Sequence, residues 1–220
     1  KKINPPALPL DIQFDSGGMQ CSAYLYRPDN QIPSPIIVMA HGLGGTRKMR
    51  LTAFAERFVA AGYACLVFDY RHFGDSEGYP RQLLDIDLQL EDWQAAINFA
   101  QQLSNIDPSK IILWGSSFSG GHVLATAANN PNIRAVISQC PFTDGLASSL
   151  VMRPLTSFKL TTLALRDRIG AAFGHAPLMV ALSAAPGETA LMNAHDAHSG
   201  SSALSQYDPD YKNYVAARFA

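Results

Sequence analysis

The stretch LWGSSFSGG, residues 113–121, places Ser117 and Ser119, two residues apart, in a cluster of glycines directly after an apolar run. A sharp turn from a strand into a helix can hold a serine clear of the backbone, but only where the residues two before and two after it are small. Gly115 and Ser119 meet this need around Ser117. A turn centred on Ser119 leaves Gly115 without a role and begins two residues past the strand. We therefore predict that Ser117, rather than Ser119, is a nucleophile.

The same stretch allows two other interpretations. One is a plain Gly/Ser-rich turn, and the other is a loop whose backbone amides hold a phosphate at a helix N-terminus. The stretch lacks the Gly-Lys-Ser/Thr ending of a P-loop and holds no complete G-x-G-x-x-G. The surrounding chain has to decide between these interpretations.

Short apolar runs alternate with helical patterns on both sides of this turn. Strands buried on both faces form continuous apolar runs, and their alternation with amphipathic helices favours a parallel sheet covered by helices. We therefore predict an α/β fold whose mostly parallel sheet is flanked by helices and preceded by an antiparallel hairpin. The hairpin is expected at 12–26, the strands at 35–40, 63–70, 110–114 and 133–140, and the helices at 49–61, 84–103 and 118–128.

The alternation stops after Asp144. Residues 146–173 are apolar and indicate a helix, whereas 176–220 are mixed, with the loop-like NAHDAHSGSS and no convincing strand. We predict a core over 1–144 and a helical cap or lid insertion over 145–220, with the last strands of the sheet missing from the chain.

Composition excludes several classes of function. The formal net charge is −1 at pH 7 and no block of like charges occurs, so nucleic acid and membrane surfaces are poor partners. The apolar runs are far shorter than a bilayer span, and no secretory signal pattern is visible. Three widely spaced cysteines, Cys21, Cys65 and Cys140, favour buried free thiols in strands. We expect a cytoplasmic protein that acts on a small molecule; its oligomeric state is not predicted.

Three segments together resemble a known superfamily. MAHGLGG at 39–45 follows the first predicted parallel strand, FDYRHFGDSEG at 68–78 follows the second, and GSSFSGGH at 115–122 follows the third. In this order and spacing they resemble the α/β-hydrolase superfamily, and most closely its dienelactone-hydrolase-like and polyketide-transferase-like serine esterases. The resemblance covers residues 10–144 well and the insertion loosely. Ser119 stands where the commonest family pattern has glycine, a small departure that the turn tolerates.

The resemblance implies hydrolysis of a carboxylic ester or thioester through an acyl-enzyme on Ser117. The implied oxyanion hole consists of the backbone N–H groups of Leu43 and Phe118, and neither a cofactor nor a metal is expected. An acyltransferase that uses the same serine remains open, as does a non-catalytic binding protein of the same fold. An apolar stretch of the insertion suggests an apolar acyl group, although ordinary helix packing explains it equally well: Leu150, Val151, Leu155, Phe158, Leu160, Leu163 and Leu165.

The remaining polar candidates favour structural roles. By resemblance, His41 braces the oxyanion loop. His122 is expected to be packed or hydrogen-bonded on its helix, and Asp144 is expected to cap a helix rather than to serve as the triad acid. Loop-bracing or solvated roles are expected for Asp69, Arg71 and Asp75, and a metal site is disfavoured for His195, Asp196 and His198.

The base of a serine triad has no evident source in this sequence. In the superfamily the acid and then the histidine follow the nucleophile along the chain. The histidines that remain, His175, His195 and His198, lie in the predicted insertion. We therefore predict that these residues form an incomplete hydrolase in which no histidine lies within hydrogen-bond reach of Ser117.

Overall fold

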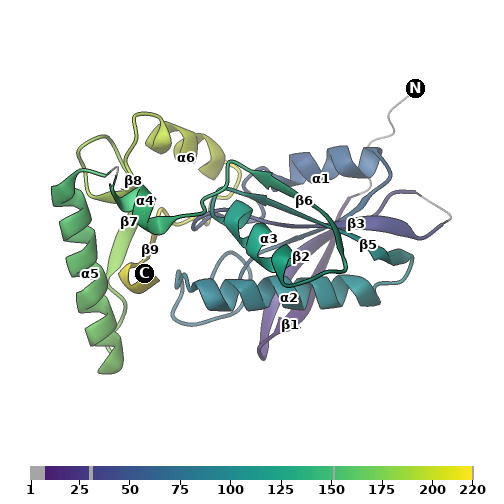
Figure 1. Ribbon diagram of the computed structural model, residues 1–220, viewed down its shortest axis with the longest axis horizontal. Coiled ribbons are helices and arrows are strands. Elements are labelled where there is room, and N and C mark those ends of the chain that lie inside the picture. The colour runs from purple at the N-terminus through teal and green to yellow at the C-terminus, as the bar shows by residue number, and fades with distance from the viewer. Residues whose placement is uncertain (1–7, 30–31, 151, 220) are drawn as a thin grey trace.

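The computed structural model describes residues 8–29, 32–150 and 152–219, and its strands form two separate sheets (Figure 1). The larger part holds β1 (Leu10–Ser16), β2 (Met19–Tyr26), β3 (Ser34–Ala40), α1 (Leu51–Ala60), β4 (Ala64–Phe68), α2 (Ile86–Gln102), β5 (Ile106–Ser116), α3 (Phe118–Ala128) and β6 (Ile133–Gln139). The smaller part holds α4 (Gly145–Leu150), α5 (Pro154–Ala172), β7 (Met179–Ser183), β8 (Ala190–Met192), α6 (Ala197–Ser205), β9 (Tyr214–Ala216) and the 3-10 helix η1 (Ala217–Phe219).

The six-stranded sheet has the order β1-β2-β4-β3-β5-β6. Strands β4, β3, β5 and β6 run parallel, whereas β1 and β2 form an antiparallel hairpin that pairs with β4. The predicted α/β class, the mostly parallel sheet and the N-terminal hairpin are confirmed. Because the parallel strands share one direction, the loops after β3, β4, β5 and β6 meet at one edge of the sheet.

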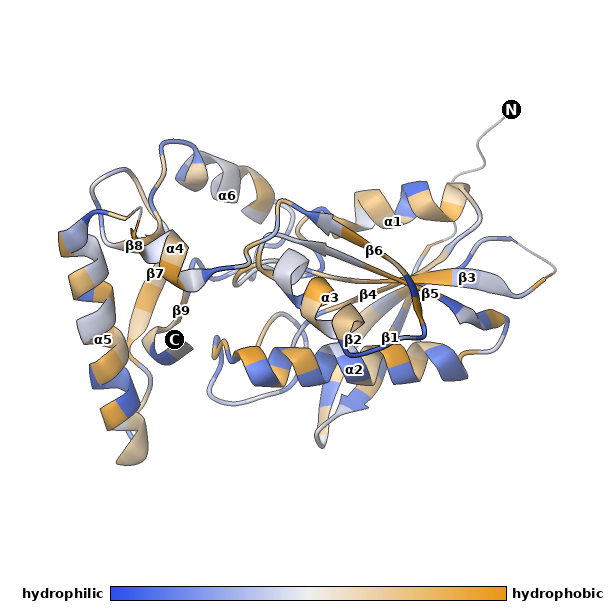
Figure 2. Ribbon diagram, in the orientation of Figure 1, coloured by the Kyte–Doolittle hydropathy of each residue, from blue (hydrophilic) through white to orange (hydrophobic). Residues whose placement is uncertain are grey.

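Side-chain alternation along the strands builds a core on each face of the sheet. On β3, Ile36, Val38 and Ala40 pack with α2 and α3, whereas Ile37 and Met39 pack with α1. Figure 2 shows the hydrophobic colouring that runs along β3. The period of two in the strand therefore places α1 on one face and α2 with α3 on the other.

The helix expected within 146–173 is present as α4 and α5, but the expectation of no strand in 176–220 is wrong, because residues 179–216 contribute a second, three-stranded sheet of order β8-β7-β9. These strands are three to five residues long, too short to give a clear alternating pattern. The stretch expected to be a loop lies partly in α6, which is rich in Ser, Gly and Ala. The division of the chain into domains at residue 144 stays a prediction.

The far edge of the main sheet departs from expectation as well. The pattern of 133–140 predicted a strand buried on both faces, but β6 pairs with β5 alone among the described strands and all seven of its residues are exposed or half-buried. Cys21 and Cys65 are buried as predicted, whereas Cys140 is exposed. Cys140 lies one residue past the end of β6, where the backbone turns with a φ of 46°.

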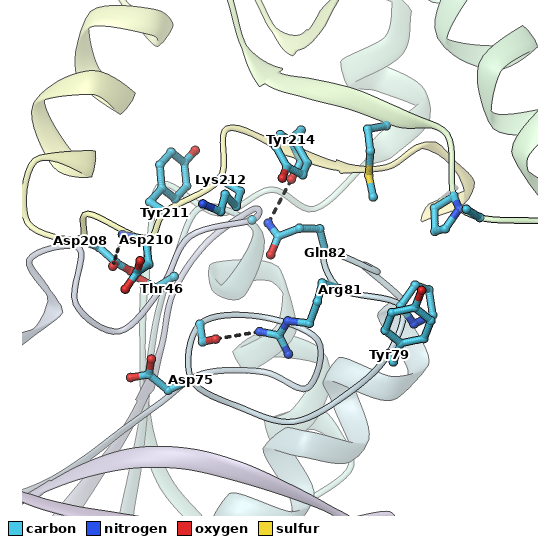
Figure 3. Close-up of a pocket in the computed structure, with 16 residues that line it drawn as sticks. Thr46, Asp75, Tyr79, Arg81, Gln82, Asp208, Asp210, Tyr211, Lys212 and Tyr214 are labelled. Atoms are coloured by element: carbon cyan, nitrogen blue, oxygen red, sulfur yellow. Dashed lines mark hydrogen bonds between the residues drawn. The ribbon is translucent and has the colours of Figure 1, made fainter.

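Hydrogen bonds join the smaller part to the core near β9 (Figure 3). The Gln82 amide donates to the Tyr214 carbonyl at 3.1 Å, and the Ala216 N–H donates to the Gln82 carbonyl at 2.8 Å. The Thr46 hydroxyl donates to the Asp208 carboxylate at 2.6 Å, in the loop that follows β3. The smaller part is therefore attached directly beside the edge of the sheet where the loops gather.

Within the described residues, no helix is long and apolar enough to cross a membrane.

Candidate active site

Ser117 occupies a strained turn between β5 and α3. Its φ of 56° and ψ of −118° lie in a region that non-glycine residues rarely adopt, at a typical cost of about 1–3 kcal/mol. A Cβ atom on Gly115 would lie 2.2 Å from the Ser119 carbonyl oxygen, so no larger residue fits two positions before the serine. This is the steric requirement on which the sequence prediction rests.

The loop after β6 holds the backbone of Ser117 in this conformation. The Ser117 N–H donates to the Gln139 carbonyl at 2.9 Å, and the Phe142 N–H donates to the Ser117 carbonyl at 2.9 Å. The Ser117 hydroxyl makes no hydrogen bond to any described residue, and its residue is half-buried. The turn thus presents a hydroxyl that is free to react at the carboxyl edge of the sheet.

Ser119 has a different environment. It is fully buried, and its hydroxyl lies 2.7 Å from the Tyr70 hydroxyl, which accepts a hydrogen bond from the Trp93 indole at 2.8 Å. Burial raises the pKa of Tyr70, so its phenol stays neutral. Ser119 therefore belongs to the hydrogen-bonded core, and neither its position nor its bonding suits a nucleophile.

The glycine-rich loop after β3 passes directly beside Ser117. A Cβ atom on Gly42 would lie 3.1 Å from the Ser117 Cβ and 3.6 Å from its Oγ. The Gly42 carbonyl accepts from the Gly45 N–H at 3.2 Å and lies 3.0 Å from His41 Nδ1. Because the N–H and C=O of a trans peptide point in opposite directions, these contacts turn the Leu43 N–H away from His41.

Two backbone amides at this site have no partner among the described residues: those of Leu43 and Phe118. Phe118 is the first residue of α3, and the first amides of a helix have no carbonyl to bond within it. Leu43, Ser117 and Phe118 all line one cavity of about 450 Å³. The predicted oxyanion donors and the predicted nucleophile therefore share one space, although their alignment on a substrate stays a prediction.

His41 acts on the loop rather than on Ser117. Burial lowers its pKa, and its Nε2 lies 3.7 Å from Asp69 Oδ1 without a hydrogen bond. A neutral ring that donates from Nδ1 to the Gly42 carbonyl satisfies these contacts. The structure thus gives His41 the bracing role that the resemblance implied.

Buried ion pairs support the loops below the site. Two of the paired residues, Arg47 and Asp92, were not identified from the sequence. Asp69 is fully buried against Arg47, and Arg71 pairs with the buried Asp92. Of the expected loop-bracing and solvated roles, Asp69 and Arg71 therefore have the loop-bracing one, whereas Asp75 is partly exposed beside Lys48. The available signal for Asp92 was a single carboxylate on the apolar face of the predicted helix 84–103.

None of the other polar candidates forms a hydrogen bond with Ser117 within the described residues. His122 is buried, with Nε2 2.8 Å from the Gln89 side-chain oxygen, as expected for a hydrogen-bonded histidine. Asp144 accepts from the Ala147 N–H at 2.9 Å, which is the expected cap. The remaining residues, His175, His195, Asp196 and His198, are exposed, and the described residues contain no group of three or more potential metal ligands. Within this part of the chain no hydrogen bond joins a histidine to Ser117.

The buried histidines should make stability depend on pH. Burial lowers the pKa of His41, His72 and His122, that of His122 to about 4. In the unfolded chain these histidines take up protons near pH 6.5, whereas in the folded chain their lowered pKa keeps them neutral. Acidification from pH 7 to pH 5 therefore lowers the free energy of unfolding, by up to about 1.4 kcal/mol for each histidine and each pH unit. Urea denaturation at both pH values measures the loss, and His122→Gln should reduce it. Equal stability of the original protein at pH 7 and pH 5 would contradict this.

The apolar stretch predicted to cover the site does so only in part. Leu160 lines the cavity beside Ser117, and Leu163 packs on the core. Four others point outward and are between 59% and 76% exposed, namely Leu150, Leu155, Phe158 and Leu165. Val151 lies outside the described residues.

A serine on a strained strand-to-helix turn, at the carboxyl edge of a mostly parallel sheet, defines an α/β hydrolase. A family model described as X-Pro dipeptidyl-peptidase (S15 family) matches residues 17–172, and the chain belongs to this family within the α/β-hydrolase superfamily. It is 65% identical over 216 residues to quorum-quenching protein AidA of Acinetobacter baumannii (strain MDR-ZJ06), covering 98% of this chain and 71% of AidA.

Two further similarities extend this result. Thiohydrolase apmlB of Arthrinium phaeospermum is 32% identical over 176 residues, which span 80% of this chain and 56% of the relative. The crystal structure of the α/β hydrolase GrgF from Penicillium sp. sh18 superposes with a TM-score of 0.82 at 23% identity, over 97% of this chain and 71% of GrgF. The likeness to GrgF shows the fold, and the family model with the named relatives supports an enzyme of the hydrolase or acyl-transfer kind.

Proposed function

We propose that this protein hydrolyses a carboxylic ester or thioester through an acyl-enzyme on Ser117. The observation that carries the proposal is the free Ser117 hydroxyl on a strained turn, beside two unpartnered amides in one cavity. Such an arrangement suits attack on an acyl carbonyl, because charge develops on the carbonyl oxygen as the new bond forms.

The proposed reaction proceeds in two halves. Ser117 Oγ bonds to the carbonyl carbon, and the N–H groups of Leu43 and Phe118 stabilise the oxyanion by about 3–4 kcal/mol each. The bond to the leaving alcohol or thiol then breaks, and the serine proton passes to that group. Water attacks the acyl-enzyme, the carboxylic acid is released, and Ser117 regains a proton. The general base of these steps is not assigned to a described residue.

Covalent labelling tests this proposal. A fluorophosphonate forms a stable bond with an activated serine, and trypsin cleavage after Lys110 and Arg134 releases one peptide that contains Ser116, Ser117 and Ser119. Fragmentation of that peptide should place the label on Ser117. Labelling of a serine in any other peptide would overturn the assignment.

Acyl transfer is the alternative within the same chemistry, since an alcohol, thiol or amine in place of water would resolve the same acyl-enzyme. Incubation of the protein with a thioester and a competing amine separates the two reactions, because hydrolysis yields the free acid and transfer yields the amide. A binding protein without chemistry would give neither product.

Quorum quenching is a second candidate role, favoured by the 65% identity to AidA over 98% of this chain. In this role the substrate would be a quorum-sensing signal that carries a hydrolysable acyl bond. The test is whether the purified protein removes signal activity from a culture supernatant, as scored by a reporter strain.

A further inference from the structure

Ser117 lies at the border between two cavities of different chemistry. One, which we name the apolar cavity, has a volume of about 450 Å³ and lies between the start of α3, α4, α5 and β8. The other, which we name the polar cavity, has a volume of about 410 Å³ and lies between the loop after β3, α1 and α6. Leu43, Ser117 and Met192 line both. A substrate attacked by Ser117 would therefore extend into both spaces.

The apolar cavity offers little to a polar ligand. The rings of Phe118 and Phe142 stand 5.3 Å apart at its wall, and Leu160 faces it from α5. No ionisable side chain occurs among the described residues that line it. Apart from Ser117, its serine hydroxyls are already used: Ser148 donates to the Asp144 carbonyl and Ser149 to the Leu146 carbonyl, each at 2.8 Å. Ser157 likewise donates to a carbonyl, at 3.2 Å.

The polar cavity has a mixed lining, in which apolar side chains such as Phe54 and Trp114 lie beside charged and hydrogen-bonding side chains that the apolar cavity lacks. Arg50 and Asp196 supply charges of both signs, and Gln139 and Tyr211 add hydrogen-bonding groups. The Arg50 guanidinium lies 4.9 Å above the Tyr207 ring, which orients it without neutralising it. This cavity suits a group that is polar and forms hydrogen bonds.

We propose that the two cavities divide the substrate at its scissile bond. An apolar acyl chain occupies the apolar cavity, and the polar alcohol or thiol portion occupies the polar cavity. This inference rests on the proposed function and adds to it the substrate class: acyl esters or thioesters with an aliphatic acyl chain and a polar leaving group. The size of each cavity lies within the range of small-molecule sites.

The affinity of the protein for carboxylic acids tests the acyl side. The series from butanoic to octanoic acid is titrated calorimetrically into the full protein, because each acid is the acyl product of such a reaction. Burial of each added methylene should lower Kd roughly fourfold until the cavity is full. If the Kd measured with the original protein does not change with chain length, the proposal is overturned.

Three alanine-to-tryptophan variants locate the binding. Ala164 on α5 lines the apolar cavity, Ala197 on α6 lines the polar cavity, and Ala172 on α5 is exposed and lines neither. Ala164→Trp should abolish the dependence of Kd on chain length, whereas Ala197→Trp and Ala172→Trp should retain it. Loss of the dependence in Ala197→Trp but not in Ala164→Trp would reverse the assignment and so overturn it. Should Ala164→Trp fail to fold by circular dichroism, Leu160→Asn provides the same comparison.

Ser117→Ala separates this inference from the proposed function. Binding of the acids does not require the nucleophile, so the chain-length dependence should persist in Ser117→Ala. If the chain-length dependence of Kd persists but the original protein is not labelled by the fluorophosphonate, the proposed chemistry is wrong and the cavity assignment stands. If Ser117 is labelled but Kd does not depend on chain length, the cavity assignment is wrong and the proposed chemistry stands.

Discussion

Replacement of Ser117 by alanine is expected to abolish fluorophosphonate labelling and to reduce ester or thioester turnover by roughly 10⁴-fold or more. The reason is chemical, because the acyl-enzyme forms on the Ser117 oxygen, and among Ser116, Ser117 and Ser119 only Ser117 has the positive φ of the strained turn. Alanine is small enough for the turn, so the fold and the loop contacts should remain.

Ser119→Ala is the matched control. It removes a hydroxyl two residues away in the same turn, but this hydroxyl is buried against Tyr70. Labelling should therefore continue, at a cost of about 1 kcal/mol in the free energy of unfolding for the lost hydrogen bond. Rates of labelling measured by mass spectrometry separate the two variants. The reverse pattern, with labelling lost in Ser119→Ala and kept in Ser117→Ala, would refute the choice of nucleophile.

The core could be predicted from the sequence because its signals are local. Apolar runs such as 35–40 and 64–68 are strands buried on both faces, and Gly17 and Gly18 supply the turn of the hairpin. The position of Ser117 also follows from a local steric rule, since only glycine fits at 115. Where one short segment decides the conformation, its pattern is sufficient.

Features that depend on distant contacts could not be predicted. Strand β9 has three residues and is defined by its pairing with β7, which is more than thirty residues away in the sequence. The exposure of β6 depends on which strands lie beside it. The buried pair of Arg47 with Asp69 joins two loops, and nothing in either segment identifies the other as its partner. The cavities beside Ser117 likewise need both parts of the chain in place.

The Arg47–Asp69 pair leads to the second large effect: Asp69→Ala should lower the free energy of unfolding by about 3–5 kcal/mol, or the melting temperature by roughly 10 °C. The Asp69 carboxylate accepts hydrogen bonds from the Arg47 guanidinium, from the Arg47 N–H at 2.6 Å and from the Asp75 N–H at 3.3 Å. Its removal leaves the Arg47 guanidinium, which is 2% exposed, without its fully buried partner.

The same substitution should slow labelling of Ser117 in protein that is still folded. Arg47 follows the glycine-rich loop that carries the Leu43 amide, so release of its backbone N–H frees the end of that loop. Asp75→Ala is the matched control, because Asp75 also pairs with Arg47 but is 43% exposed and contributes about 1 kcal/mol or less. Thermal melts and labelling rates at 20 °C below each midpoint measure both effects. Equal losses of stability in the two variants would show that burial of Asp69 is not what stabilises the loop, and unchanged labelling in folded Asp69→Ala would show that the loop holds its position without Asp69.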